Sequence, residues 1–241
     1  MAQPKAVLFD LDETLFDHRH SADAALGALQ KLWPRLATIA VTELQVRHRR
    51  ILDETHPRVL AGTLTKEDSR VLRMRLLLET AGISPSDSEL QVSLGVIGPA
   101  YAASRRPIPG ALAVLESLRR RGIRIGVVTN NHVDEQVDKL RACGLKTLVD
   151  ALAISQETGF IKPDPRMFLV ALSRVGVRAE EAVMVGDSWE ADILGALASG
   201  IRPVWFNRAS LSRLHPGVQE LRSFEPTDAA FQVIVGEPFV L

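Results

Sequence analysis

The chain has 241 residues, of which 46% are hydrophobic and 24% charged, close to the average of soluble globular proteins. This composition excludes intrinsic disorder, collagen-like repeats and fibrous coils. Lys and Arg together number 29, as do Asp and Glu, so the net charge is zero and no global field recruits nucleic acid or an anionic membrane.

The first predicted element is a buried strand over residues 5–10, an apolar run that ends in acidic residues. The stretch 17–106 has helical periodicity but no convincing strand. Helix starts are predicted there at four places: Ser21, Thr42 with Gln45 as a capping box, Thr65, and Ser86 with Glu89 as a second capping box. We therefore expect a core of residues 1–16 and 107–241 and an inserted all-α domain of residues 17–106, with hinges near 17 and 107.

Beyond residue 107, strands alternate with amphipathic helices. Strands are predicted at 123–130, 151–155, 182–187 and 203–206, and helices at 109–121, 132–143, 165–175 and 189–199, each helix being followed by a glycine. This alternation predicts an α/β fold with a Rossmann-like parallel sheet, whose ligand site lies beyond the carboxyl ends of the strands. The segment 221–241 is expected to be an edge strand or a packing tail, and its sequence indicates no particular function.

Asp10 and Asp12 end the first strand, and the alternation of side chains places them on the same side of the chain. Two carboxylates about 4 Å apart repel each other by on the order of 4 kcal/mol at an effective dielectric constant of about 20. One of them must therefore be protonated, or a cation must lie between or beside them. Such a pair suits acid–base or metal chemistry.

A further acidic group follows the strand at 182–187, where Gly186 permits a tight exit from the sheet and Asp187 and Asp192 can both face the first pair. Mg²⁺ is the cation that this oxygen-only set favours, because it is commonly shared between one or two carboxylates and a substrate phosphate. Histidine and cysteine are absent from these motifs, which argues against zinc.

Two further strand ends carry groups that suit a phosphate. Thr129 and Asn130 supply a hydroxyl and backbone N–H groups just before a helix N-terminus, which is a common anion site. Lys162 stands in a segment with two prolines, Pro163 and Pro165, and can offset the negative charge gathered at this edge.

Four motifs therefore lie at or near strand ends, in this order: Asp10-Leu11-Asp12-Glu13-Thr14, Val127-Val128-Thr129-Asn130, Lys162-Pro163-Asp164-Pro165, and Gly186-Asp187 with Asp192. They resemble the motifs of the haloacid dehalogenase-like (HAD) hydrolase superfamily, and the resemblance covers nearly the whole chain. The all-α insertion between the first and second motifs resembles the helical cap of the type 1 members. Glu13 departs from the commoner glycine at its position, without affecting the chemistry.

The resemblance implies a Mg²⁺-dependent phosphomonoester hydrolase of the phosphatase branch, acting on a small phosphorylated metabolite of the nucleotide or sugar phosphate type. Asp10 would be the nucleophile that forms an aspartyl-phosphate, and Asp12 the general acid and then the general base. Thr129 and the Asn130 amide would hold phosphate oxygens, and Lys162 would stabilise Asp10 and the transferring group.

The resemblance also implies a metal site and a role for the cap. Mg²⁺ would be bound by the Asp10 side chain, the Asp12 backbone carbonyl and Asp187, with Asp192 joining directly or through water. The cap would close over the site, exclude water and select the leaving group.

Several alternatives stay open at this stage. On the same fold, the rivals are a phosphomutase and a haloacid dehalogenase, although the superfamily's dehalogenases usually lack a carboxylate at the position of Asp12. Asp192 could simply charge the first turn of a helix. His18 and His20 could bind the phosphorylated substrate at the mouth of the site or be ordinary loop residues. The basic run at 47–50 is best interpreted as a solvated helix face, then as a substrate-anion site, and last as the contact of a non-catalytic nucleic-acid or protein-binding module.

Cellular location and assembly are only weakly constrained. No apolar run approaches the roughly 18 residues of a membrane span, and the first residues lack a signal-peptide pattern. The single cysteine, Cys143, fits a reducing compartment. We expect a cytoplasmic monomer or homodimer that has no nucleic-acid or membrane partner.

Overall fold

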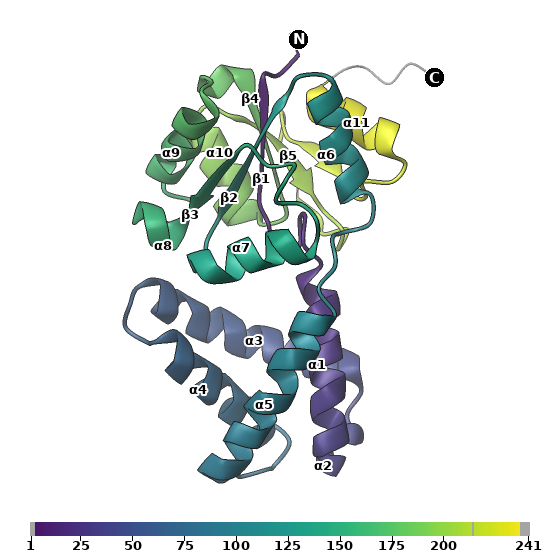
Figure 1. Ribbon diagram of the computed structural model, residues 1–241, viewed down its shortest axis with the longest axis vertical. Helices are drawn as coiled ribbons and strands as arrows, with labels where there is room; N and C mark the ends of the chain where they lie inside the picture. Colours follow the sequence, from purple (N-terminus) through teal and green to yellow (C-terminus); the bar gives the residue numbers. More distant parts are fainter. Residues whose placement is uncertain (1–2, 214, 237–241) are drawn as a thin grey trace. The chain divides into compact units, whose positions relative to one another are not determined.

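The computed structural model describes residues 3–213 and 215–236 and divides into two compact units. One unit comprises Met1–Asp17 and Arg106–Leu241, and the other comprises His18–Arg105. The first unit contains a six-stranded sheet with helices on both faces, and the described part of the second unit is entirely helical (Figure 1). The predicted α/β fold is thus confirmed.

The sheet of the first unit is parallel throughout and has the strand order β3-β2-β1-β4-β5-β6. Its strands are β1 (Ala6–Phe9), β2 (Arg124–Thr129), β3 (Ala151–Ile154), β4 (Ala182–Gly186), β5 (Arg202–Phe206) and β6 (Gln219–Leu221). This is the order of doubly wound Rossmann-like sheets, in which the strand order reverses beside β1. Ala6 pairs with Arg124 of β2 on one side and with Ala182 of β4 on the other, so the reversal lies between β1 and β4.

Helices cover both faces of this sheet (Figure 1). They are α6 (Ala111–Arg120), α7 (Val133–Ala142), α8 (Ser155–Thr158), α9 (Pro165–Val175), α10 (Gly195–Ala198) and α11 (Thr227–Val235). On one face, Leu8 of β1 and Met184 of β4 belong to a buried cluster with Phe168 of α9. Elsewhere in the core, Phe9 makes an edge contact with Phe224, which stacks on Phe206 with ring centroids 4.3 Å apart. The alternating side chains of β1 are therefore buried on both faces, as expected of a central parallel strand.

Two predicted helices of this unit have different limits in the structure. The helix expected at 109–121 begins only at Ala111, because Gly110 takes a left-handed conformation with φ of 80°. The helix expected at 189–199 consists of a wide π-helical turn, Trp189–Leu194, followed by α10.

The second unit contains α1 (His18–Leu32), α2 (Pro34–Ala37), α3 (Val41–Leu60), α4 (Lys66–Glu79) and α5 (Asp87–Ala103). Its core is a cluster of buried leucines and other apolar side chains, among them Leu29, Leu44, Leu78 and Leu90. None of the helices in the described ranges is both long enough and apolar enough to cross a membrane.

The C-terminal segment 221–241 differs from its predicted form. Leu221 ends the edge strand β6, and the apolar run at 231–235 is not a strand but the buried side of helix α11, which packs on the core. The ring of Phe231 lies 4.2 Å from the guanidinium of Arg121, at the end of α6. Residues 237–241 of this prediction lie outside the described residues.

Candidate active site

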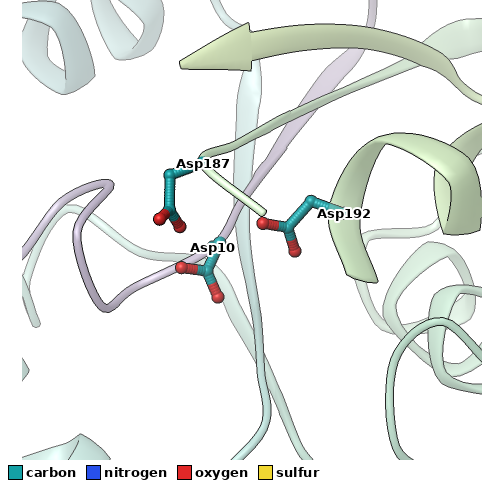
Figure 2. Close-up of side chains that lie close together, drawn as sticks. All are labelled: Asp10, Asp187 and Asp192. Carbon is teal, nitrogen blue, oxygen red and sulfur yellow. The ribbon is translucent and has the colours of Figure 1, made fainter. Parts of the chain in front are cut away.

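Three carboxylates meet where β1 and β4 end. Asp10 directly follows β1, Asp187 directly follows β4, and Asp192 comes from the π-helical turn (Figure 2). One carboxylate oxygen of each lies within 4.8 Å of the others. Because β1 and β4 are the adjacent strands between which the order reverses, this cluster lies where open α/β sheets bind their ligands.

The backbone around β4 places Asp187 and Asp192 with little freedom. A Cβ at Gly186 would lie 2.3 Å from the Asp192 carboxylate, so only glycine permits this approach. The Ser188 N–H donates to Asp192 Oδ2 at 3.0 Å, and the Trp205 indole donates to the Asp187 carbonyl at 2.9 Å. The position of both carboxylates therefore depends on the missing side chain of Gly186 and on Trp205 of the neighbouring strand β5.

Lys162 is the cation at the centre of the cluster. Its ammonium donates to Asp10 Oδ1 at 2.6 Å, to Asp192 Oδ1 at 2.7 Å and to the Val128 carbonyl at 2.7 Å. The Asn130 side chain fixes the lysine's backbone, since it donates to the Lys162 carbonyl and accepts from the Lys162 N–H at 2.8 Å. The structure thus brings together residues of all four sequence motifs.

Burial and charge crowding shift the pKa values of these groups. Burial raises the pKa of Asp10 to about 7, against the opposing effect of Lys162 and with that of Asp192. Burial, followed by the charges of Asp10 and Asp192, also raises the pKa of Asp187 well above its usual value. Burial acts to lower the pKa of Lys162, but Asp10 and Asp192 outweigh it and raise the pKa. The site thus has more negative charge than its own lysine can balance.

Asp12 has a separate set of partners on helix α7. The Lys139 ammonium donates to its two carboxylate oxygens at 2.6 and 2.9 Å, and the Gln136 amide donates to Oδ2 at 3.0 Å. The same amide nitrogen donates to Thr129 Oγ1 at 2.5 Å. The predicted phosphate-binding hydroxyl and the predicted acid are therefore connected by one side chain.

Sequence reasoning missed both Gln136 and Lys139. A signal for them exists, because they lie three residues apart on the buried face of α7 together with Leu140. A lysine and a glutamine on an apolar helix face next to a polar strand-end motif indicate a polar partner in the interior.

The loop that follows Asp12 is held by ion pairs. Glu13 has a left-handed backbone with φ of 65°, which explains why glycine suits this position. Its carboxylate is buried and lies 3.4 Å from Arg208, which also reaches Asp17 at 3.5 Å. The guanidinium of Arg106 donates to Asp17 at 2.8 Å. These contacts fix the loop from Asp12 to Asp17, where the first segment of this unit ends.

The two predicted specificity histidines belong to the other unit. His18 and His20 form the first turn of α1, and His18 Nδ1 lies 2.7 Å from the Tyr101 hydroxyl of α5. The structure therefore places them on a different unit from the acidic cluster, and their contact with substrate stays a prediction.

Comparison with known proteins identifies the family. The model of the haloacid dehalogenase-like hydrolases matches residues 4–200. The chain is 36% identical over 209 residues to a ribulose-1,5-bisphosphate 5-phosphatase of Halopiger xanaduensis, covering 84% of each protein. It is 40% identical over 185 residues to a phosphoserine phosphatase of Thermus thermophilus, covering 76% of this chain and 65% of that protein.

A solved structure has a similar fold. The putative HAD-hydrolase YfnB of Bacillus subtilis matches with a TM-score of 0.76 at 23% identity, covering 96% of this chain and 100% of that one. The chain belongs to the haloacid dehalogenase-like hydrolase family. The predictions of an enzyme and of the family's phosphatase branch are confirmed by these relatives.

Proposed function

We propose that this protein is a Mg²⁺-dependent phosphomonoesterase that hydrolyses a small phosphorylated metabolite through an aspartyl-phosphate on Asp10. The observation that carries the proposal is the burial of Asp10 against Lys162 at the point where the strand order reverses, beside Asp187 and Asp192. A carboxylate placed there lies at the edge where open α/β sheets bind their ligands, and its charge is balanced by a fixed cation.

In the proposed reaction, an Asp10 oxygen attacks phosphorus and the bond from phosphorus to the leaving oxygen breaks. Asp12 gives its proton to that oxygen. Asp12 then takes a proton from water, which attacks the aspartyl-phosphate and releases inorganic phosphate and the Asp10 carboxylate. Thr129 and the Asn130 backbone N–H bind phosphate oxygens, and Lys162 stabilises the charge that develops on them.

The donor set and the charge of the cluster fit Mg²⁺. When ionised, the Asp10, Asp187 and Asp192 carboxylates and the Lys162 ammonium together carry a charge of −2, which one divalent cation balances. All candidate ligands are oxygens, as Mg²⁺ requires. We assign its binding to the Asp10 and Asp187 side chains and the Asp12 carbonyl.

Asp192 would join the metal site directly or through water. Both of its oxygens already accept hydrogen bonds, from Lys162 and from the Ser188 N–H, which favours the water-mediated form. When bound, the ion supplies a Lewis acid that polarises the phosphoryl group.

The names of the relatives favour a small substrate. They include ribulose-1,5-bisphosphate 5-phosphatase, glyceraldehyde 3-phosphate phosphatase and phosphoserine phosphatase. We therefore propose a sugar phosphate or a similarly small phosphomonoester, or a nucleotide, as the substrate class. The helical unit His18–Arg105, inserted directly after the Asp12 loop, is the proposed cap that selects it, with His18 and His20 as candidate specificity residues.

The test is the release of phosphate from an aryl phosphate and from a panel of small phosphorylated metabolites, with Mg²⁺ and with a chelator. Asp10→Asn should lose turnover by about 10⁴-fold or more, as expected for removal of a nucleophile. Asp138→Asn, which changes an exposed aspartate of α7, should behave as wild type.

Absence of Mg²⁺-dependent release from the folded wild-type protein would contradict the proposal. Halide release from a 2-haloacid, or phosphate transfer within a bisphosphate substrate, would then identify the dehalogenase or the mutase. Salt-sensitive oligonucleotide binding that persists in Asp10→Ala would identify a binding module.

A further inference from the structure

Two buried polar side chains of α7 surround the carboxylate of Asp12. Gln136 is 0% exposed and Lys139 is 3% exposed, although the opposite face of this helix lies in solvent. Lys139 contacts both oxygens of Asp12, and its ammonium lies 5.3 Å from the ring centre of Phe16. Burying an ammonium group costs free energy unless a carboxylate compensates it. The buried Lys139 therefore requires the Asp12 carboxylate to stay beside this face of the helix.

The orientation of the Gln136 amide follows from its partners. An ionised carboxylate only accepts hydrogen bonds, so the amide NH₂, and not its oxygen, faces Asp12. The second amide hydrogen then goes to Thr129 Oγ1. Because that oxygen is already an acceptor, the Thr129 hydroxyl hydrogen is directed elsewhere and can be donated to a phosphate oxygen.

The Gln136 carbonyl oxygen is buried and has no hydrogen-bond partner within residues 3–213 and 215–236. A buried carbonyl oxygen normally accepts a hydrogen bond, and a buried oxygen without a donor costs free energy. The Gln136 side chain is therefore held by its two donated hydrogen bonds, to Asp12 and to Thr129, and not through its oxygen.

We infer that Lys139 and Gln136 are positioning residues, which hold the Asp12 carboxylate at a fixed distance from the phosphate bound at Thr129. The inference rests on the proposed function. Gln136 joins the group that binds phosphate to the group that moves the proton, and Lys139 prevents rotation of the carboxylate. An error of about 1 Å in such an arrangement costs about 10²-fold in rate.

The two half-reactions allow a specific test. Aspartyl-phosphate formation from an alkyl phosphate needs a proton from Asp12, whereas formation from 2,4-dinitrophenyl phosphate does not, because dinitrophenolate leaves without one. Hydrolysis of the aspartyl-phosphate needs Asp12 for either substrate. A misplaced Asp12 therefore slows every step except the first turnover of the dinitrophenyl ester.

Lys139→Met is measured by stopped flow and in the steady state with Mg²⁺ present. Turnover of an alkyl phosphate and steady-state turnover of dinitrophenyl phosphate should both fall about 10²-fold. The first-turnover release of dinitrophenol should stay within about tenfold of wild type, so that a burst of one equivalent per site precedes the slow phase. Gln136→Met should give the same pattern with smaller losses.

Arg141→Met is the matched control, because Arg141 lies on the exposed face of the same helix with 68% of its side chain accessible. It should equal wild type in all phases. An equal fall of burst and steady state would overturn the inference in favour of a general disturbance of the site, and so would unchanged kinetics.

If Lys139→Met does not fold, as judged by near-ultraviolet circular dichroism, Gln136→Met alone decides between these outcomes. A wild-type protein without Mg²⁺-dependent phosphate release would contradict the proposed function itself. Wild-type turnover with unaltered variants would contradict only the role of Lys139 and Gln136.

Discussion

Each of the two aspartates in the first motif has its own lysine. Asp10 pairs with Lys162, which follows β3, and Asp12 pairs with Lys139 of α7. The repulsion expected between neighbouring carboxylates is thus relieved by two protein cations, and the remaining negative charge lies on Asp187 and Asp192. This separation suits the two proposed tasks, in which Asp10 is the nucleophile at the metal and Asp12 is the acid–base group at the leaving oxygen.

Replacing Lys162 by Met should separate charge balance from metal binding. Phosphate release should fall about 10²–10³-fold, because a cation that stabilises the transition state is lost. Mg²⁺ affinity, measured by calorimetric titration, should not fall, since the cluster becomes more negative. Lys5→Met removes an ion pair of a lysine that is 65% exposed and should change neither quantity. A parallel fall in affinity would show that Lys162 mainly holds the carboxylates in place.

Gly186 is a position where one added carbon atom should disturb the acidic cluster. Ala at this position would drive its Cβ into the Asp192 carboxylate, which sits 2.3 Å away. We expect Gly186→Ala to weaken Mg²⁺ binding and to lower kcat by about 10²-fold. Gly27→Ala, where an added Cβ meets nothing within 4 Å, is the control in calorimetry and kinetics. Wild-type Mg²⁺ affinity in Gly186→Ala would contradict the assigned role of Asp192.

The first residues of the helices show which helix starts the local sequence predicts correctly. Thr65 caps α4 by accepting from the Asp68 N–H, and Ser86 forms the predicted capping box with Glu89 on α5. The predictions at Ser21 and Thr42 are wrong. Ser21 lies inside α1, where its buried hydroxyl donates to the Ser104 carbonyl.

The start of α3 has no side-chain cap. This helix begins at Val41 after Ala40, so Thr42 is already in its first turn and the Thr42–Gln45 capping box does not form. A capping side chain competes with packing, and where neighbouring helices fix the entry of the chain, the pattern alone does not decide the first residue.

Helix α3 carries a histidine that predicts a pH dependence. Burial lowers the pKa of His48 to about 4, and the charges of Arg73 and Arg49 act in the same direction. The unfolded chain binds this proton with a pKa of about 6.5, so the stabilising effect is complete above that pH and is lost as the pH falls toward 4.

The prediction is measured by urea unfolding of wild type and His48→Gln between pH 7 and 4. The unfolding free energy of wild type should fall by on the order of 2 kcal/mol more than that of the variant over this interval. The carboxylates titrate equally in both proteins, so the difference between their unfolding free energies isolates the contribution of His48. Parallel curves for the two proteins would contradict the assignment.

For the whole molecule, the strand order determines where chemistry can occur. The sheet reverses its winding between β1 and β4, and the side chains that follow these two strands are Asp10 and Asp187. All proposed metal ligands therefore belong to the first unit, and the helical unit supplies none of them.

Binding of Mg²⁺ should consequently stabilise the first unit, which holds all the proposed ligands, against unfolding. At a free Mg²⁺ concentration of about 100 times the Kd, the first unit should gain about 2.7 kcal/mol. Hydrogen exchange should slow at the amides of β1, β4 and the π-helical turn, with α3, α4 and α5 as the internal reference. Asp187→Asn should abolish the effect. Equal slowing in both units, or none in the first, would contradict the assigned ligands.

The sequence by itself determined the α/β class and the edge of the sheet where the acidic residues gather. Short apolar runs that end in Asp10, Thr129 and Asp187 need only local burial and side-chain alternation to be recognised, because parallel strands present their carboxyl ends on one edge. Four motifs in the family's order then indicate the hydrolase family, which the comparisons confirm.

Only the tertiary structure decided which cation serves which carboxylate. Lys162 is 152 positions from Asp10, and Lys139 is 127 positions from Asp12, so neither pairing is visible in any local pattern. The spacing of Gln136, Lys139 and Leu140 shows that they share one helix face, but only the packed molecule shows which carboxylate this face meets. The physical reason is that burial, and with it the need for a partner, is a property of the packed molecule.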